Sequence, residues 1–295
     1  MSIINAFTVD VEDYYQVSAF ERDIDRSRWG QYEQRVVANT HRILEKLDER
    51  GVKATFFVLG WVASKDPQLV REIHEAGHEV GSHSFSHELV YHLSPAEFRR
   101  DLCRSRDLLE DITGEAVTCY RAPSFSITRR SLWALEILAE EGFRVDSSVY
   151  PIYHDRYGIP GSNPHLHQVE TSSGRLWEFP LSVAHVAGLK FPVAGGGYFR
   201  LFPLAWTNHC LARINRATGK PFVFYIHPWE LDPHQPRIQG RLSSRIRHYV
   251  GLKGTGRKLR SLAGAFRFGP MCDVIRSQRE AHVAAGSKAE GSCPS

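Results

Sequence analysis

Two histidines in one short segment have the residue type and the spacing of a metal site. His83 and His87 stand four residues apart within residues 77–87, a segment that also contains glycine and serine. Two imidazoles at this spacing can reach one metal ion from a single helical turn. The alternative interpretation is that both histidines are structural residues held by hydrogen bonds.

An acidic cluster could supply a third ligand. Asp10, Glu12 and Asp13 end the first apolar run of the chain. A catalytic site of two histidines and one carboxylate leaves coordination positions open for water, which suits metal-assisted hydrolysis. The carboxylates therefore favour a metal site over two structural histidines.

The composition is that of a globular protein and argues against several other classes. The chain has 295 residues, of which 42% are apolar and 24% charged, with 37 Lys and Arg against 33 Asp and Glu. A net charge of +4 does not by itself indicate nucleic-acid binding, and we expect no nucleic-acid partner. The five cysteines are scattered without a Cys-x-x-Cys pair, so the sequence indicates neither a disulfide framework nor a thiolate zinc site.

The N-terminal segment lacks the features of a secretory signal. Residues 1–7 carry no basic side chain, and Asp10 follows before an apolar signal core could form. The sequence also has no run of about 18 apolar residues that could span a membrane. We therefore expect a cytoplasmic protein.

Short apolar runs alternate with segments of helical periodicity along most of the chain. The runs predict strands at residues 3–9, 54–59, 78–81, 116–120, 144–146, 176–179 and 222–226. The periodic segments predict helices at residues 36–47, 67–76, 95–112 and 129–141. This alternation is typical of an α/β fold with a largely parallel sheet, closed or nearly closed into a barrel.

Four polar residues stand at or just past the carboxyl ends of predicted strands. They are Asp10, His83, Arg121 and His227. Since α/β folds place their chemistry at these strand ends, we expect the four side chains to converge at one rim.

Four motifs follow one another at residues 8–13, 81–87, 121–125 and 225–228. Together they resemble the ordered motifs of the polysaccharide deacetylases with the NodB homology domain, which are similar to carbohydrate esterase family 4. Residues 10–15, 195–200 and 227–230 resemble a branch of that family associated with exosortase and exopolysaccharide loci. The resemblance implies a distorted (β/α) barrel of the NodB type.

The resemblance also implies a reaction. It is the metal-dependent hydrolysis of N-acetyl groups on amino-sugar residues of a bacterial exopolysaccharide or its lipid-linked precursor. A divalent ion, with zinc as the default, would sit on His83, His87 and a carboxylate, lowering the pKa of a water molecule and polarising the acetyl carbonyl. Asp10 would be the general base and His227 the general acid.

Two further residues acquire roles through the same resemblance. Arg121 would hold Asp10 ionised and oriented for proton transfer. The backbone N–H of Ser124, which follows a proline, would be a second donor to the oxyanion of the tetrahedral intermediate.

The chain departs from the common family pattern in the identity of its metal carboxylate. Many members have two adjacent aspartates, whereas Val11 separates Asp10 from the next acids. Glu12 matches variants with one residue between base and ligand, and Asp13 keeps the usual side-chain type. We favour Glu12 as the ligand and keep Asp13 as the alternative.

Two other departures affect the substrate contact and the acid. Ser124 stands where the family has an aromatic residue, so an aromatic substrate contact is lost or moved to Phe125. The tryptophan motif that orients the acid histidine is not evident, and we assign that role to Asp146. The alternative for Asp146 is a helix or turn cap.

Three aromatic residues could form a wall on which a sugar stacks. They are Trp177, Tyr198 and Trp229. Aromatic side chains of this kind are about as often part of the apolar core.

The clearest shift in composition divides the chain into three segments. We expect a catalytic domain at residues 1–235, a basic helical extension packed on it at 236–276, and a disordered tail at 277–295. Residues 236–271 hold nine Lys and Arg and no Asp or Glu. This stretch is either a solvated helical cap or a surface that docks on anionic lipid or a lipid-linked saccharide at the inner face of the membrane.

Two other functions remain as alternatives to deacetylation. One is the metal-dependent hydrolysis of a small cyclic amide or ureide. The other is an inactive saccharide-binding protein, against which the joint presence of Asp10, Arg121 and His227 argues, because binding alone requires neither a base nor an acid.

Overall fold

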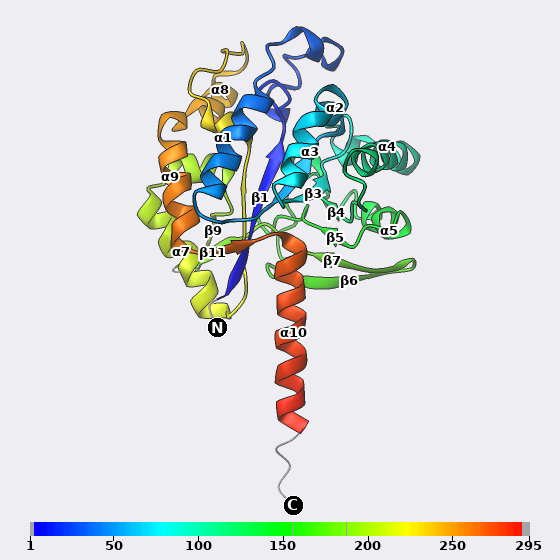
Figure 1. The fold of residues 1–295 in the computed structure, drawn as a ribbon, viewed down its shortest axis with the longest axis vertical. Helices are drawn as coiled ribbons and strands as arrows, with labels where there is room; N and C mark the ends of the chain where they lie inside the picture. The colour runs from blue at the N-terminus through cyan, green and yellow to red at the C-terminus, as the bar shows by residue number, and fades with distance from the viewer. Residues whose placement is uncertain (1–2, 155, 187, 291–295) are drawn as a thin grey trace, which may run out of the picture.

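One curved sheet organises the fold (Figure 1). The computed structural model describes the backbone of residues 3–154, 156–186 and 188–290, with side chains up to residue 281. Within this part of the chain, nine strands form the sheet in the order β10-β1-β2-β3-β4-β5-β7-β6, and β11 also pairs with β1. Every neighbouring pair is parallel except β6 and β7. The strands are β1 (Ile4–Val11), β2 (Thr55–Val58), β3 (Glu79–Ser82), β4 (Cys119–Tyr120), β5 (Val145–Asp146), β6 (His167–Thr171), β7 (Gly174–Glu178), β10 (Val223–Ile226) and β11 (Arg267–Gly269).

Helices cover the outside of the sheet, and two further strands pair apart from it. The helices are α1 (Val36–Asp48), α2 (Gly60–Lys65), α3 (Pro67–Glu75), α4 (Pro95–Thr113), α5 (Trp133–Glu140), α6 (Gly196–Leu201), α7 (Leu204–Thr218), α8 (Leu242–Tyr249), α9 (Leu252–Ala265) and α10 (Met271–Glu290). Strands β8 (Val183–Val186) and β9 (Leu189–Pro192) pair antiparallel. No helix in the described residues has both the length and the apolar character needed to cross a membrane.

The sheet is a distorted barrel whose hydrogen-bonded ladder stays open between its edge strands in the described residues. Single hydrogen bonds bridge the opening. The N–H of Leu181 donates to the carbonyl of Val149, and the N–H of Val223 on β10 donates to the hydroxyl of Ser182. The segment that follows β7 therefore links the region beyond β5 to β10.

Alternation along the strands separates the inside of the barrel from the outside. On β1, Ala6 packs in a smaller apolar cluster and Phe7 in a larger one. The smaller cluster also contains Phe57 of β2 and Val223 of β10. Because side chains alternate between the two faces of a strand, Asp10 shares the inner face with Ala6.

Local sequence signals set the longest helix of the barrel wall. Helix α4 begins with a capping box, in which the Ser94 hydroxyl accepts from the Glu97 N–H while the Glu97 carboxylate accepts from the Ser94 N–H. Pro95 occupies the first turn, where its missing N–H costs nothing. Gly114 ends the helix with a φ of 71°, a conformation that glycine adopts without strain.

The strands and helices expected from apolar periodicity are confirmed, with their ends shifted by a few residues. The structure adds α2, β6, β8, β9, α6 and α7, which the apolar periodicity did not predict. The basic segment 236–271 contains α8 and α9, and its last part forms β11, which pairs with β1 inside the sheet.

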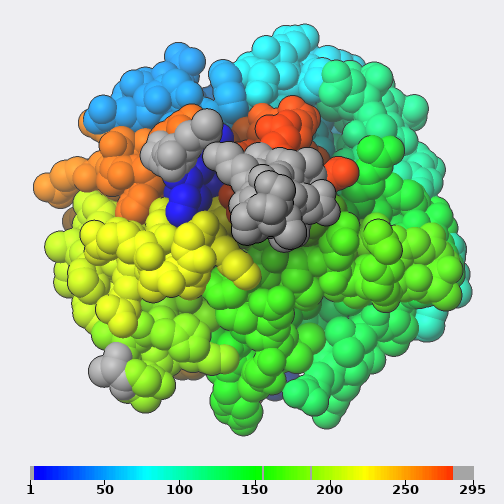
Figure 2. All heavy atoms as spheres, turned by 90° about the horizontal axis from the view of Figure 1, so that it is seen from below, coloured from blue at the N-terminus to red at the C-terminus, as the bar shows by residue number. Residues whose placement is uncertain are grey.

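The expected disorder from residue 277 onward is wrong for residues 277–290, because α10 continues as a helix to Glu290 (Figure 1). The physical reason is composition, since this stretch is rich in alanine, the best helix former. Residues 291–295 lie outside the described residues. Helix α10 starts at the end of the barrel where the N-terminus lies, and Figure 2 shows this end with β1 beside the C-terminal segments.

Candidate active site

Three buried side chains bring potential metal ligands together at the carboxyl ends of β1 and β3. Glu12, His83 and His87 each place one ligand atom so that all three atoms lie within 4.8 Å of one another. The Nδ1–H of His83 donates to the Arg121 carbonyl at 2.8 Å, which leaves Nε2 free to bind a metal. Burial lowers the pKa of His83 to about 4, so its imidazole is neutral, as a ligand must be.

The surroundings of the Glu12 carboxylate indicate whether Glu12, His83 and His87 fit a cation. Its Oε2 lies 2.6 Å from Nε2 of His87 but makes no hydrogen bond, although it is buried. Burial alone would raise the pKa of Glu12, but His87, His227 and His83 together lower it to about 2. A buried, ionised oxygen without a hydrogen bond beside two imidazoles fits a divalent cation.

The two histidines reach this point from a loop rather than from a helical turn. His83 directly follows β3, and His87 has a φ of 53°, as Ser84 has one of 63°. The expected helical turn is therefore wrong. The left-handed residues instead turn the chain so that the two rings lie with their centroids 5.4 Å apart.

Asp10 and Arg121 form a buried ion pair on one side of the three ligands. A guanidinium nitrogen of Arg121 lies 2.6 Å from Oδ1 of Asp10, and both side chains are almost fully buried. Other guanidinium N–H groups donate to the hydroxyl of Thr8 and to the hydroxyl and carbonyl of Ser147. The second oxygen, Oδ2, lies 3.9 Å from Nε2 of His227 and faces the site.

His227 stands opposite Asp10, and Glu230 orients it. Nδ1 of His227 donates to Oε1 of Glu230 at 2.7 Å, while its Nε2 faces Asp10 and Glu12. Burial by itself would lower the pKa of His227, but Glu230, Glu12 and Asp10 raise it to about 9. A cation on Glu12 would cancel part of this effect, so Glu230 is the lasting cause. His227 is thus protonated near neutral pH, and 18% of its side chain is exposed.

Asp146 does not orient His227, so that expectation is wrong. Its carboxylate accepts from the hydroxyl and the N–H of Ser148 and lies beside Glu178. Glu230 has the orienting role because the short 3-10 turn Pro228–Leu231, directly after β10, folds it back onto His227.

Asp13 also has a structural role rather than that of a ligand. Its carboxylate accepts from the N–H groups of Tyr14, Arg35 and Val36 and so caps the start of α1. Burial raises the pKa of Asp13 to about 6, although these three N–H groups oppose the rise. Of the two candidate carboxylates, only Glu12 lies with the histidines.

The residues expected from the sequence to contact substrate lie in different parts of the structure. Trp229 is buried between two rings: it stacks on His227 at 5.1 Å and on His248 at 4.1 Å between centroids. Its indole N–H donates to Oε1 of Glu12 at 3.2 Å. Trp229 therefore positions the acid and a ligand rather than forming a free sugar-stacking wall.

Phe125 is buried against Arg121 and Tyr225 and is part of the core. Trp177 is half-buried on β7 against the smaller apolar cluster. Tyr198 is half-buried on α6, where its ring stacks with that of Phe202 at 6.3 Å. None of these three has a described contact with the potential metal ligands.

A groove adjoins the group, and Ser124 lies in its wall. The Ser124 hydroxyl lies 2.7 Å from that of Ser18, and its backbone has a φ of 50°. The groove continues past Trp229 to α8, and its lining includes Arg156, Tyr157, Gly197 and Arg247. The groove thus lies between the loop after β1 and α8, which are at the upper end of Figure 1.

Substitutions of Glu12 and Asp13 should have different effects on metal binding and stability. We expect Glu12→Gln to lose bound metal while keeping its thermal stability, because a ligand charge is lost but no helix cap. Asp13→Ala should keep its metal and lose about 1–2 kcal/mol of unfolding free energy, because it removes the cap of α1. Metal analysis together with urea unfolding of both variants measures this, and metal loss in Asp13→Ala with retention in Glu12→Gln would reverse the assignment.

Comparison with known proteins shows which families and folds the chain resembles. Residues 27–144 match the model of a family described as polysaccharide deacetylase, and residues 147–276 match a domain of unknown function, DUF3473. A peptidoglycan-N-acetylglucosamine deacetylase of Bacillus cereus is 37% identical over 98 residues, which are 33% of this chain and 36% of the relative. One of Listeria monocytogenes is 35% identical over 91 residues, which are 31% of this chain and 20% of the relative. The matches thus span about a third or less of these relatives' length.

Solved structures show the same fold. A Mycobacterium smegmatis protein described as a "putative polysaccharide deacetylase" has a TM-score of 0.61 at 22% identity, covering 96% of this chain and 90% of that one. Puue allantoinase also has a TM-score of 0.61, at 15% identity, covering 95% of this chain and 91% of that one. The chain therefore has the NodB-type α/β fold, and its residues 27–144 are similar to the polysaccharide deacetylase family.

Proposed function

We propose that this chain is a metal-dependent hydrolase that removes N-acetyl groups from amino-sugar residues of a bacterial exopolysaccharide or of its lipid-linked precursor. One observation carries the proposal: a carboxylate held by Arg121 and a histidine held by Glu230 approach each other to 3.9 Å beside the group formed by Glu12, His83 and His87. The names of the two peptidoglycan deacetylases supply the acetylated amino sugar as the substrate class.

Glu12, His83 and His87 are the residues that would hold the metal ion. Two imidazoles and one carboxylate form a common catalytic ligand set for zinc, which is the ion we propose. When bound, such an ion lowers the pKa of water and polarises a carbonyl. Trp229 and the Arg121 carbonyl fix the orientation of Glu12 and His83, respectively, which keeps their ligand atoms directed at one point.

Asp10 and His227 divide the proton transfers in this proposal. Asp10 accepts a proton from the attacking water through Oδ2, because its other oxygen is held by Arg121. His227 donates the proton on Nε2 to the departing amine, while Glu230 stabilises its charged form. Arg121 and Glu230 are positioning residues, since each acts through the side chain that it contacts. The N–H of Ser124 remains our prediction for the oxyanion.

Acetate release separates the proposed roles. We expect His83→Ala to lose the active-site metal and activity, and Asp10→Asn to keep that metal while turning over about 10²–10⁴-fold more slowly, because only the base is removed. The assay measures bound metal and acetate from chito-oligosaccharides. His74→Ala, a histidine on α3 outside the site, is the control and should behave as wild type.

Other products distinguish the alternatives. Ammonia or a ring-opened product from a cyclic ureide, with no acetate from any saccharide, would replace deacetylation by cyclic-amide hydrolysis. Metal and sugar bound without turnover would indicate a saccharide-binding protein. Equal acetate release by wild type, His83→Ala and Asp10→Asn would show that the roles are misassigned.

The alkaline side of the pH profile tests His227 as the acid. A general acid must carry its proton, so kcat/KM should fall as pH rises through the pKa of His227, which Glu230 helps to raise. In Glu230→Gln, burial continues to lower this pKa while the largest opposing cause is gone. The fall should therefore begin at lower pH, and Glu170→Gln, an exposed carboxylate on β6, should leave the profile unchanged. An unmoved profile in Glu230→Gln would rule out this role for the pair.

We also propose that α8 docks the enzyme on an anionic membrane surface at the cytoplasmic face, where lipid-linked saccharides are built. Leu242 and Ile246 of this helix are 70% and 58% exposed, and Arg241, Arg245 and Arg247 beside them are exposed cations. Apolar side chains among cations suit the interface of an anionic bilayer. The same helix borders the groove, so docking would bring lipid-linked substrate to the site.

Vesicle flotation tests the docking surface. We expect the protein to float with vesicles containing phosphatidylglycerol, to be released by salt, and to stay behind with pure phosphatidylcholine. The double variant Leu242→Ser with Ile246→Ser should lose binding, because the apolar contact is removed. Leu189→Ser, 63% exposed on β9, is the matched control and should bind like wild type. If wild type shows no salt-sensitive flotation, this part of the proposal is wrong.

A further inference from the structure

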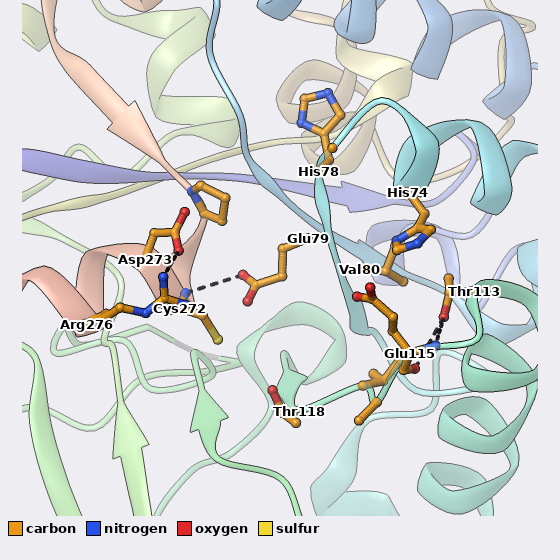
Figure 3. Close-up of a pocket in the computed structure, with 14 residues that line it drawn as sticks. His74, His78, Glu79, Val80, Thr113, Glu115, Thr118, Cys272, Asp273 and Arg276 are labelled. Carbon is orange, nitrogen blue, oxygen red and sulfur yellow. Dashed lines mark hydrogen bonds and ion pairs between the residues drawn. The ribbon is translucent and has the colours of Figure 1, made fainter.

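A second group of potential metal ligands lies on the inner face of the barrel, away from the active site. Glu79 is the first residue of β3, Cys119 the first of β4, and Cys272 lies in the first turn of α10. One ligand atom from each lies within 4.8 Å of the others. Glu79 stands four residues before His83 on the same strand side, so the two groups occupy opposite ends of the barrel interior. Figure 3 shows Glu79 pointing toward the start of α10 beside Cys272.

The distances within this group match a tetrahedral zinc site. The two sulfur atoms of Cys119 and Cys272 lie 3.5 Å apart, and Oε1 of Glu79 lies 3.5 Å from the Cys119 sulfur. Zinc–sulfur bonds of about 2.3 Å and a zinc–oxygen bond of about 2.1 Å at tetrahedral angles give about 3.8 Å between sulfurs and about 3.6 Å from sulfur to oxygen. Small side-chain shifts would therefore suffice to bind the ion.

The second oxygen of Glu79 is already held in place. Oε2 accepts from the Thr55 hydroxyl and from the N–H of Met271 at 3.1 Å, at the N-terminus of α10. The positive end of the helix dipole favours negative charge there. Both contacts orient Glu79 so that Oε1 faces the sulfurs, as outer contacts orient the ligands of known metal sites.

The surroundings of Cys119 disfavour a free thiolate. The hydrogen bond to Cys272, burial and the nearby Glu79 all raise the pKa of Cys119, so this thiol resists ionisation in the absence of a cation. A disulfide would need the sulfurs to approach from 3.5 Å to about 2.04 Å, while Cys119 is held in the sheet between β3 and β5. A divalent cation needs no such approach and would itself favour the thiolates.

The surroundings leave room for a fourth ligand. Glu79 and Cys272 border an open cavity of about 390 Å³, which is also lined by His78, Thr118 and Arg276. A water molecule could complete the coordination from this side. The nearest cation in that lining, Arg276, forms an ion pair with Asp273.

We propose that Glu79, Cys119 and Cys272 form a second metal site, which binds a thiophilic divalent ion such as zinc and ties the start of α10 to β3 and β4. The site is separate from the one proposed for catalysis. Sequence spacing could not reveal it, because 40 residues separate Glu79 from Cys119 and 153 separate Cys119 from Cys272.

Cobalt spectroscopy tests the proposal. The full chain, stripped of metal and with its thiols kept reduced, is titrated with Co²⁺ while the near-ultraviolet thiolate-to-cobalt charge-transfer band is recorded. We expect the band in wild type and in His83→Ala, and its loss in Cys119→Ser and Cys272→Ser. Zinc content should fall from two ions per chain to one in Cys272→Ser as well as in His83→Ala.

Two further variants control for misfolding and for non-specific thiols. Cys103→Ser removes a thiol on α4 that contacts Glu141, and it should keep the band. Glu79→Gln keeps both sulfurs and the side-chain shape, so it should keep the band but require more Co²⁺ to develop it. Absence of the band in wild type, its persistence in Cys272→Ser, or its loss in Cys103→Ser would each overturn the proposal.

Discussion

The buried ion pair between Arg121 and Asp10 is the constraint around which the site is built. Arg121 has no exposed surface, and its guanidinium contacts side chains or carbonyls from β1 and from the segment after β5, with its plane over Phe57 at 4.3 Å. Leaving one member of such a pair unpaired costs about 3–5 kcal/mol. The barrel interior is stable only when β1, β4 and the end of β5 come together around this guanidinium. This arrangement also determines which oxygen of Asp10 faces His227.

Because side chains alternate along each strand, the residues of the inner face continue along the whole barrel. The inner face that holds Asp10 on β1 also holds His83 beyond β3 and His227 beyond β10, and apolar residues such as Phe57 and Val145 fill the barrel below them. Asp10, His227 and the potential metal ligands therefore lie above apolar residues that fill the barrel interior. Glu79, Cys119 and Cys272 lie beyond these apolar residues, at the other end of the barrel interior.

The sequence predicted what depends on periodicity and strand ends. Alternating apolar runs located the strands, and the rule that chemistry lies at their carboxyl ends brought Asp10, His83, Arg121 and His227 together. Features that depend on a fold-back of the chain were missed. Glu230 reaches His227 only through the 3-10 turn after β10, and Asp13 caps a helix that begins 23 residues later. Glu230 lies in the motif at residues 227–230, but its contact with His227 follows only from the turn that the motif forms.

The acid of the site depends on a part of the chain that lies outside the matched deacetylase segment. Glu230 also forms an ion pair with Arg200 at 2.6 Å, and Arg200 donates to the carbonyls of Arg247, His248 and Val250. His248 in turn stacks on Trp229, which stacks on His227. The potential metal ligands at residues 83–87 and His227 thus belong to segments matched by two different family models. Because Arg200 carries a buried charge that needs both Glu230 and these carbonyls, α8 cannot be displaced without disturbing His227. The region of unknown function is therefore a structural part of the barrel rather than an appended module.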